Sequence, residues 1–521
     1  MIDSISTNTN AAVNNPVAEY LASAAPETIN TAFLAYLCNL TEVAKIAPET
    51  AASVVRELEN QRRRIKLIAS ENYCSFPVQL AMGNLLTDKY AEGKPGHRFY
   101  AGNENVDAVE LDAAGEARRL FGAEYANVQP HCGADANVLA YWAILTVRVE
   151  NPALEKYGET NLYKLSGPQW KELKELLGNQ KLLGLDYYSG GHLTHGYRYN
   201  LSSRMFDVHS YSVSPETGLL DYEKIEEQAL DIKPLILLAG YSAYPRKINF
   251  RRMREIADRA GAVFMVDMAH FAGLVAGKVF EGDFDPVAHA HVVTSTTHKT
   301  LRGPRAGLVL AKKEFAEALD KGCPLTMGGP LPHIIAAKAV AFKEASREDF
   351  RVYARRIVEN CRTLAASCIK GGLRVLTGGT DNHLILINVD ELKGPAGPIT
   401  GRQAESALHE CNITVNRNSL PDDPNGPWYT SGLRIGTAAV TSLGMGGAEL
   451  EETGELIALV LKNTAPVRDP KDPAKFSKTK YVIAETVKAE VRDRVKKLLG
   501  RFPVYPELDL DFLRKSFCGG E

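Results

Sequence analysis

The chain has 521 residues, of which 45% are hydrophobic and 24% charged, the composition of a globular protein larger than one core normally holds. Its net charge of -2 gives no electrostatic case for a nucleic-acid partner. No stretch reads as a signal peptide or as a membrane span of ~20 apolar residues. The eight cysteines include no C-x-x-C pair. We therefore expect a cytoplasmic protein of two or more domains, without disulfides, metal, membrane or nucleic acid.

The N-terminal region divides into a polar tail and a helix. Residues 1 to about 17 are rich in Asn, Thr and Ala, which predicts disorder. From Pro48 the pattern becomes helical, with Val54, Val55 and Leu58 on one face. The loop that follows, from Tyr90 to Gly102, contains Glu92 as its one acidic residue, and a glutamate held in such a loop has the chemistry of a general acid or base.

Residues 126–140 predict a strand, a glycine turn and the start of a helix. Backbone N–H groups at a helix N-terminus form a natural phosphate cradle, and Gly133, between Cys132 and Ala134, permits close approach. The polar segment 151–182 is expected to include a short helix starting near Ser166, and no chemistry is assigned to it.

Two further segments place polar side chains after glycines or buried strands. His192 lies in G-G-H-L-T-H-G, where the glycines favour a functional histidine over a core one. The apolar run 235–242 predicts a buried strand ending at Ser242, a candidate cofactor contact. A helix over 251–260 then completes a β-α-β unit, whose crossover is right-handed by default.

Asp267 and Lys299 carry the strongest chemical signal. Asp267 ends the continuous apolar run 263–266, which is typical of a strand buried on both faces. Lys299 follows the next strand along the chain, in T-S-T-T-H-K. A lysine can hold a carbonyl cofactor as a Schiff base, and a carboxylate can keep a pyridine nitrogen protonated. At consecutive strand ends, the two residues favour pyridoxal phosphate bound covalently to Lys299.

The C-terminal part predicts a smaller domain. A helix at about 333–344 leads to strands near 373–376 and 383–389 and to helices at about 402–411 and 447–462. The Pro-, Lys- and Asp-rich segment 465–479 is expected to be a loop. A final helix ends at Gly500, with a stripe of apolar residues four apart. That stripe is Ile483, Val487, Val491, Val495 and Leu499. The expected domains are 1–72, an N-terminal extension and arm; 73–345, binding the cofactor; and 346–521.

Several motifs together resemble the serine hydroxymethyltransferase family. They are L-I-A-S-E-N-Y, K-Y-A-E-G-K-P-G-H-R-F-Y, G-G-H-L-T-H-G, V-D-M-A-H-F-A-G-L-V-A, T-S-T-T-H-K-T-L-R-G-P-R and T-S-G-L-R-I-G-T, in the family's order, and the resemblance covers the chain from about residue 62 to 447. The resemblance implies a fold-type-I α/β enzyme with a mostly parallel, seven-stranded-type sheet and a smaller α+β C-terminal domain. It implies reversible conversion of serine and glycine with tetrahydrofolate as co-substrate. The chain is similar to longer bacterial members.

The resemblance also assigns roles within one cavity. Lys299, Thr296, Asp267 and His192 would be catalytic, with His192 stacked on the cofactor ring. Further cofactor contacts implied by the resemblance are His270, Ser242, Cys132, Gly133, Ala134 and His298. The implied substrate contacts are Ser70, Leu193, Arg434, whose guanidinium would grip a carboxylate, and Asn418, which would touch folate.

Other implied residues belong to a neighbouring subunit's site. Tyr90, Glu92 and Tyr100 would enter it, with Glu92 catalytic, and Gly328 and Gly329 would donate N–H groups to the phosphate. A homodimer or tetramer with active sites at the dimer interface follows. In this fold type the N-terminal arm usually wraps the partner, although an ordinary packed helix is as good an interpretation.

The sequence departs from the family at three places, which leaves other functions open. Cys132 and Ala134 replace the usual serines, Tyr187 replaces an aliphatic folate contact, and Ala306 replaces a glycine. One alternative is a racemase or folate-independent β-hydroxy amino acid aldolase on the same scaffold. Others are a binding protein without activity and a zinc hydrolase using His192, His195, Asp267 and His270. We expect weakened cofactor retention from the two lost hydroxyls, by about tenfold or more.

Overall fold

A computed structural model describes residues 15–392 and 397–519. The described chain divides into two compact units, residues 15–65 with 495–519, and residues 66–494. β1 (Ile65–Lys66) and α21 (Glu485–Gly500) lie at the boundaries. Of the tail expected to be disordered, residues 1–14 lie outside the described residues. Pro16 instead begins a helix whose first N–H groups bind the Asn15 side chain, so the expectation is wrong there.

The first unit is a set of packed helices: α1 (Pro16–Ser23), α2 (Thr31–Ile46), α3 (Pro48–Arg63) and α22 (Leu510–Phe517). α3 is the helix expected from Pro48. It buries Val55 and Leu58, but Val54 is 39% exposed and was wrongly placed on the buried face. Arg62 ties the unit together, because its guanidinium donates to the carbonyls of Val504, Tyr505 and Leu508. Contact with a partner subunit stays a prediction.

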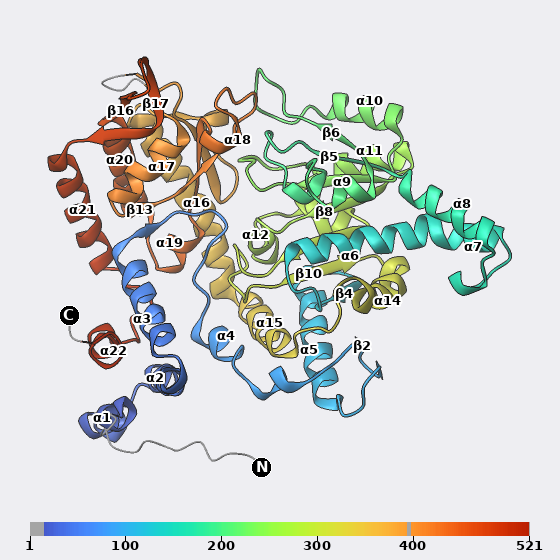
Figure 1. The fold of residues 1–521 in the computed structure, drawn as a ribbon, viewed down its shortest axis with the longest axis horizontal. Helices are drawn as coiled ribbons and strands as arrows, with labels where there is room; N and C mark the ends of the chain where they lie inside the picture. Colours follow the sequence, from blue (N-terminus) through green and yellow to red (C-terminus); the bar gives the residue numbers. More distant parts are fainter. Residues whose placement is uncertain (1–14, 393–396, 520–521) are drawn as a thin grey trace. The chain divides into compact units, whose positions relative to one another are not determined.

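A seven-stranded sheet organises the second unit, in the order β4-β10-β9-β8-β7-β5-β6 (Figure 1). Its strands are β4 (Tyr125–Asn127), β5 (Lys181–Leu185), β6 (Asp207–Tyr211), β7 (Ile236–Gly240), β8 (Val263–Asp267), β9 (Val292–Thr296) and β10 (Gly307–Ala311). β9, β8, β7, β5 and β6 run parallel, whereas β10 is antiparallel to both neighbours. The mostly parallel α/β sheet is confirmed, and the carboxyl ends of its parallel strands meet at one edge.

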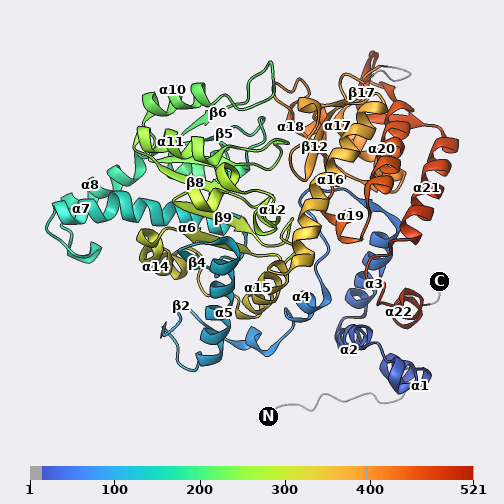
Figure 2. The same ribbon diagram turned by 180° about the vertical axis from the view of Figure 1, so that it is seen from behind.

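Both faces of this sheet are buried, because successive strand residues join opposite apolar clusters. In β8, Phe264 and Val266 join one cluster, while Val263 and Met265 join the other. The second cluster is completed by α6 (Gly133–Leu145) and α14 (Ala316–Thr326), seen in front of the sheet in Figure 1. Helices on the face turned forward in Figure 2 complete the first cluster: α5 (Glu104–Phe121), α11 (Phe250–Ala260), α12 (Ala272–Ala276), α15 (Pro332–Ala345) and α16 (Glu348–Lys370).

The helices and short strands of this part follow in chain order. They are α4 (Phe76–Leu80), β2 (Gly93–Lys94), β3 (His97–Arg98), α5 (Glu104–Phe121), α6 (Gly133–Leu145), α7 (Asn151–Lys156), α8 (Gly167–Gly178), α9 (Ser202–Met205), α10 (Tyr222–Ile232), α11 (Phe250–Ala260), α12 (Ala272–Ala276), α13 (Pro286–His289), α14 (Ala316–Thr326), α15 (Pro332–Ala345) and α16 (Glu348–Lys370). The helix expected near Ser166 is confirmed as α8, which Ser166 and Gln169 cap reciprocally.

A smaller antiparallel sheet, in the order β11-β12-β15-β14, follows α16. The elements here are β11 (Arg374–Val375), β12 (Leu384–Asn388), α17 (Gly401–Glu410), β13 (Ile413–Thr414), β14 (Asn416–Asn418), α18 (Gly426–Tyr429), β15 (Gly432–Gly436), α19 (Ala438–Ser442) and α20 (Gly447–Lys462). The strands and helices expected in this region are present within a few residues. The expected domain boundaries at 72/73 and 345/346 stay predictions.

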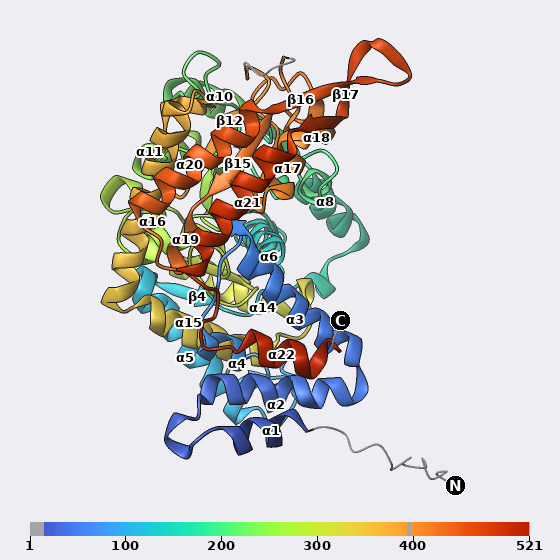
Figure 3. The same cartoon turned by 90° about the vertical axis from the view of Figure 1, so that its left-hand side faces the viewer.

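The expectation of a loop over residues 465–479 is wrong. β16 (Thr464–Asp469) and β17 (Asp472–Ile483) form an antiparallel hairpin, which projects in Figure 3. Most residues of β17 are exposed, so its sequence does not show the alternation of apolar and polar residues that marks a half-buried strand. Its backbone is held by a distant helix start, where Gln403 donates to the carbonyls of Ser477 and Lys480. The final helix is confirmed, except that Ile483 belongs to β17.

Candidate active site

The loops after the parallel strands enclose a cavity of about 870 Å³. β8 ends at Asp267, and its neighbour β9 ends at Thr296, three residues before Lys299. The expected residues that line the cavity are Ser70, Cys132, Gly133, Ala134, His192, Leu193, Ser242, Asp267, His270, Thr296, His298, Lys299, Asn418 and Arg434. The structure thus brings most of the sequence-predicted site together.

Lys299 is held as a reactive amine. Its Nζ donates to Thr296 Oγ1 at 2.9 Å, and its carbonyl accepts from the Asn72 amide at 2.8 Å. Burial lowers the pKa of Lys299 to about 8, against the attraction of Asp267; Arg434 and Arg305 lower it further. A substantial fraction of the amine is therefore neutral near physiological pH, as attack on a carbonyl carbon requires.

Asp267 is a buried but ionised carboxylate. Burial alone would raise its pKa, but the hydrogen bond and charge of His195, with His192 and the Asn137 amide, hold the pKa below its usual value. Oδ2 accepts from Asn137 Nδ2 at 2.9 Å and from His195 Nε2 at 3.3 Å, and Oδ1 accepts from the Ala269 N–H at 3.0 Å. A carboxylate oxygen accepts about two hydrogen bonds, so Oδ1 retains capacity for a protonated ring nitrogen.

His192 lies beside these groups as a neutral ring. Burial lowers its pKa to about 4. The Thr194 N–H donates to His192 Nδ1 at 3.2 Å, which places the ring proton on Nε2. A neutral imidazole can stack on an aromatic cofactor ring without adding a second cation beside Lys299.

Arg434 is a cation in the cavity wall that has no carboxylate partner among the described residues. Its Nε donates to Asn416 Oδ1 at 3.1 Å and its Nη1 to the Ser242 carbonyl at 2.8 Å. Burial lowers its pKa to about 10. Within residues 15–392 and 397–519 no carboxylate pairs with this guanidinium, so its remaining N–H donors are available to a substrate carboxylate.

The start of α6 has the form of a phosphate cradle. A Cβ on Gly133 would lie 2.7 Å from Thr296 Cγ2, so only glycine lets the helix start approach the end of β9 this closely. Cys132 Sγ accepts from the Asp135 N–H at 3.5 Å, and the first N–H groups of any helix lack intrahelical partners. Buried His298 Nδ1 also has no partner in the described chain. These groups fit the phosphate end of pyridoxal phosphate.

The other cavity residues are held by their own contacts. His270 Nδ1 lies 3.2 Å from His383 Nε2, and burial lowers the pKa of both rings. The Asn418 amide donates to the Ser419 carbonyl at 2.6 Å, and Leu193 is 41% exposed at the rim.

Five expected residues form a separate group that does not line this cavity. Tyr90 Oη donates to Glu92 Oε1 at 3.4 Å, and the rings of Tyr90 and Tyr100 lie 5.0 Å apart. Gly329 lies against Tyr90 and Glu92 and follows Gly328, and its carbonyl lies 2.9 Å from His131 Nε2. Tyr90 and Tyr100 are about half exposed. Their expected position in a neighbouring subunit's site stays a prediction.

Sequence reasoning missed three polar side chains of the site. Asn137 bridges Thr194, Thr294 and Asp267; it lies one turn inside the helix start predicted within residues 126–140, but no role was assigned to it there. His195 was considered only as a metal ligand, and it instead binds Asp267. Arg305 lines the cavity, and its place in R-G-P-R was the available signal.

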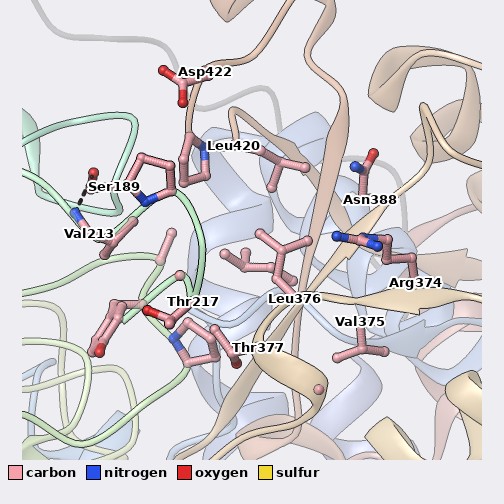
Figure 4. A pocket seen from close by; sticks show the side chains of 18 of the residues that line it. Ser189, Val213, Thr217, Arg374, Val375, Leu376, Thr377, Asn388, Leu420 and Asp422 are labelled. Atoms are coloured by element: carbon pink, nitrogen blue, oxygen red, sulfur yellow. Dashed lines mark hydrogen bonds between the residues drawn. The ribbon is translucent and has the colours of Figure 1, made fainter. Parts of the chain in front are cut away.

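A second cavity of about 600 Å³ lies between Val213–Gly218 and the β11 end of the smaller sheet (Figure 4). None of the expected site residues lines it. Three of its charged side chains are already engaged, because Arg374 pairs with Glu391 at 3.1 Å and Glu216 accepts from the Ser214 hydroxyl. We assign it no chemistry.

Searches of the described residues for two other kinds of function found none. No three or more His, Cys, Asp or Glu side chains there are grouped as a metal site would require, including the four considered for zinc. None of the helices described is both long and apolar enough to cross a membrane.

Comparisons with known proteins agree on one family. The family model described as serine hydroxymethyltransferase matches residues 43–155 and 163–457. Serine hydroxymethyltransferase of Treponema pallidum is 59% identical over 504 residues, covering 97% of this chain and 87% of the relative. The enzymes of that name from Salinispora tropica and Cutibacterium acnes are 55% and 53% identical, covering 92% and 91% of this chain and 99% and 96% of theirs.

Proposed function

Since the chain belongs to the serine hydroxymethyltransferase family, we propose that it is a pyridoxal phosphate enzyme that interconverts L-serine and glycine, with tetrahydrofolate accepting the one-carbon unit. The observation that supports this most directly is the shared cavity of Lys299, Asp267 and Arg434. The cavity combines an amine with a lowered pKa, a buried ionised carboxylate and a guanidinium that pairs with no carboxylate of the described chain. A carbonyl cofactor and an amino acid substrate require these groups.

Cofactor binding would use both ends of the cavity. Lys299 would bond covalently to the cofactor carbonyl and be displaced by the substrate amine. The start of α6, with His298, would hold the phosphate, while Asp267 holds a proton on the ring nitrogen. When bound, the group supplies an electron sink for a bond at the substrate's α carbon.

Substrate orientation would come from Arg434 and Ser70. Two parallel N–H donors of Arg434 fix the plane of the substrate carboxylate, and Ser70 lines the same cavity. A fixed carboxylate sets which bond at the α carbon stands perpendicular to the ring. Asn418 and Leu193 would contact the folate, and Tyr187 lines the cavity where the family usually has an aliphatic contact.

Proton transfer would come from a second copy of the chain. Glu92 would move the proton of the serine hydroxyl oxygen during loss of the hydroxymethyl carbon. Because Glu92, Tyr90 and Tyr100 do not line the cavity of their own chain, the proposal includes a homodimer or tetramer with shared sites.

The deciding experiment is an absorption spectrum of the purified protein with pyridoxal phosphate, first with glycine and then with glycine and tetrahydrofolate. The proposal expects a visible band that grows on folate addition, together with folate-dependent exchange of the glycine α proton. A spectrum that changes on addition of glycine or alanine but not on addition of tetrahydrofolate would support the racemase or the aldolase. No cofactor spectrum even at high pyridoxal phosphate would exclude the proposal.

A further inference from the structure

Lys338 is a buried lysine that the proposed chemistry does not use. It lies within α15 with a side chain only 1% exposed. Lysines are almost never this buried unless their charge is compensated. Burial lowers the pKa of Lys338 to about 7, against which Glu110 and Cys323 raise it.

The Lys338 amine is surrounded by backbone carbonyls. Its Nζ donates to the carbonyl oxygens of Val128 at 2.5 Å, Pro130 at 3.0 Å and Gly307 at 2.8 Å. An ammonium has three N–H donors, whereas a neutral amine has two, so the arrangement suits the charged form.

These carbonyls belong to the two segments that build the cofactor end of the cavity. Val128 and Pro130 lie in the connection from β4 to the phosphate cradle at Gly133. Gly307 begins β10, directly after the loop that carries Lys299. The pairing of β4 with β10 stops at Asn127 and Val309. Beyond that point the regular ladder ends, and the carbonyls of Val128, Pro130 and Gly307 accept from the lysine.

The two segments also lie too close for any other residue at position 307. A Cβ there would be 2.2 Å from the Cys132 carbonyl oxygen, and the Gly307 N–H donates to the Pro130 carbonyl at 3.0 Å. Lys338 therefore holds together the segment that enters the cradle at Gly133 and the strand that follows the loop of Lys299.

We infer that Lys338 is a positioning residue for the cofactor phosphate, clamping the segment that enters the cradle to the strand that leaves the Lys299 loop. The inference rests on the proposed function, because the phosphate is that of pyridoxal phosphate. If Lys338 only filled space, an apolar side chain of the same length would serve equally well, without desolvating an amine.

The test compares two ligands that differ only in the phosphate. Lys338→Met keeps an unbranched side chain one atom shorter than lysine and removes its donors. We expect the dissociation constant for pyridoxal phosphate to rise about tenfold, the equivalent of one charge-assisted hydrogen bond. The constant for pyridoxal, which lacks the phosphate, should stay within about twofold. Lys343→Met is the matched control, since Lys343 lies on the same helix but is exposed and paired with Asp112 at 2.7 Å.

Each outcome of this comparison supports or overturns the clamp or the proposed function. A loss confined to pyridoxal phosphate supports the clamp. An equal loss for both ligands, or none, overturns it, and the thermal unfolding midpoint of the apoprotein shows whether general destabilisation is the cause. If Lys338→Met does not fold, Lys338→Gln replaces it, because its amide keeps two N–H donors. We expect Lys338→Gln to fold and to lose less affinity for pyridoxal phosphate than Lys338→Met would, with no loss for pyridoxal. A Lys338→Gln protein without this phosphate-specific loss would count against the clamp. A wild-type protein that binds neither ligand would instead refute the proposed function.

Discussion

Lys299 gives the site a pH dependence whose direction follows from its surroundings. With its pKa lowered to about 8, chiefly by burial, the amine is mostly protonated below that pH and loses the lone pair that attacks a carbonyl. The rate at which apoprotein captures pyridoxal phosphate should fall about tenfold per pH unit below pH 8 and level off above it. Stopped-flow absorption, with borohydride trapping to identify the residue, measures this. A rate still rising at about pH 10 would mean an ordinary lysine.

Cys132 is a residue whose replacement by serine should raise the affinity for pyridoxal phosphate. Its thiol is exposed in the cavity at the cradle, where it offers only a weak donor. Cys132→Ser adds a hydroxyl that can donate to a phosphate oxygen, and we expect pyridoxal phosphate to bind about tenfold more tightly. Equilibrium titration of the apoprotein measures the change, with Cys38→Ser, another exposed cysteine, as control. Unchanged affinity would show that other donors, such as Arg305, already satisfy the phosphate.

At the scale of elements, the approach of α6 to β9 can be tested by a pair of substitutions. Gly133→Ala places a methyl 2.7 Å from Thr296 Cγ2, and Thr296 is fixed by bonds to Ala269 and Lys299. The helix start must move, so we expect pyridoxal phosphate affinity to fall about tenfold.

Thr296→Ser removes that methyl and keeps the hydroxyl, so it should restore most of the affinity in the double variant. Titration of the two single variants and the double variant measures the coupling between the positions. Losses that simply add would show that the two side chains do not collide.

The elements that sequence predicted well are those whose signal is local. The strand ending at Asp267 is apolar on both faces, and α8 carries its own capping residues. The β16–β17 hairpin was missed because its partners include Gln403, more than 70 residues away. The site divides in the same way. Asp267 and Lys299 follow strand ends and were found, whereas Asn137 reaches Asp267 only through the packing of α6 on the sheet.

At the scale of the whole molecule, one chain holds two incomplete halves of the proposed site. The cavity has the amine, the carboxylate and the guanidinium, while the Glu92 group lies elsewhere on the same chain. In a symmetric dimer each partner can complete the other's cavity, since a twofold interface repeats every contact. A substitution in either half then disables a different set of sites.

Co-assembly of two inactive variants tests this arrangement. Lys299→Ala damages the cavity of its own chain, and Glu92→Gln damages the cavity of the partner. If the variants are co-expressed with different tags and pair at random, about half of the dimers are mixed and each has one intact site, so about a quarter of wild-type activity should return. Lys299→Ala with Asp267→Ala is the matched control, because both substitutions lie in the cavity and no mixed dimer has an intact site. Activity no higher than this control's would place Glu92 in the site of its own chain, whereas a Glu92→Gln protein that is active by itself would place Glu92 outside the chemistry.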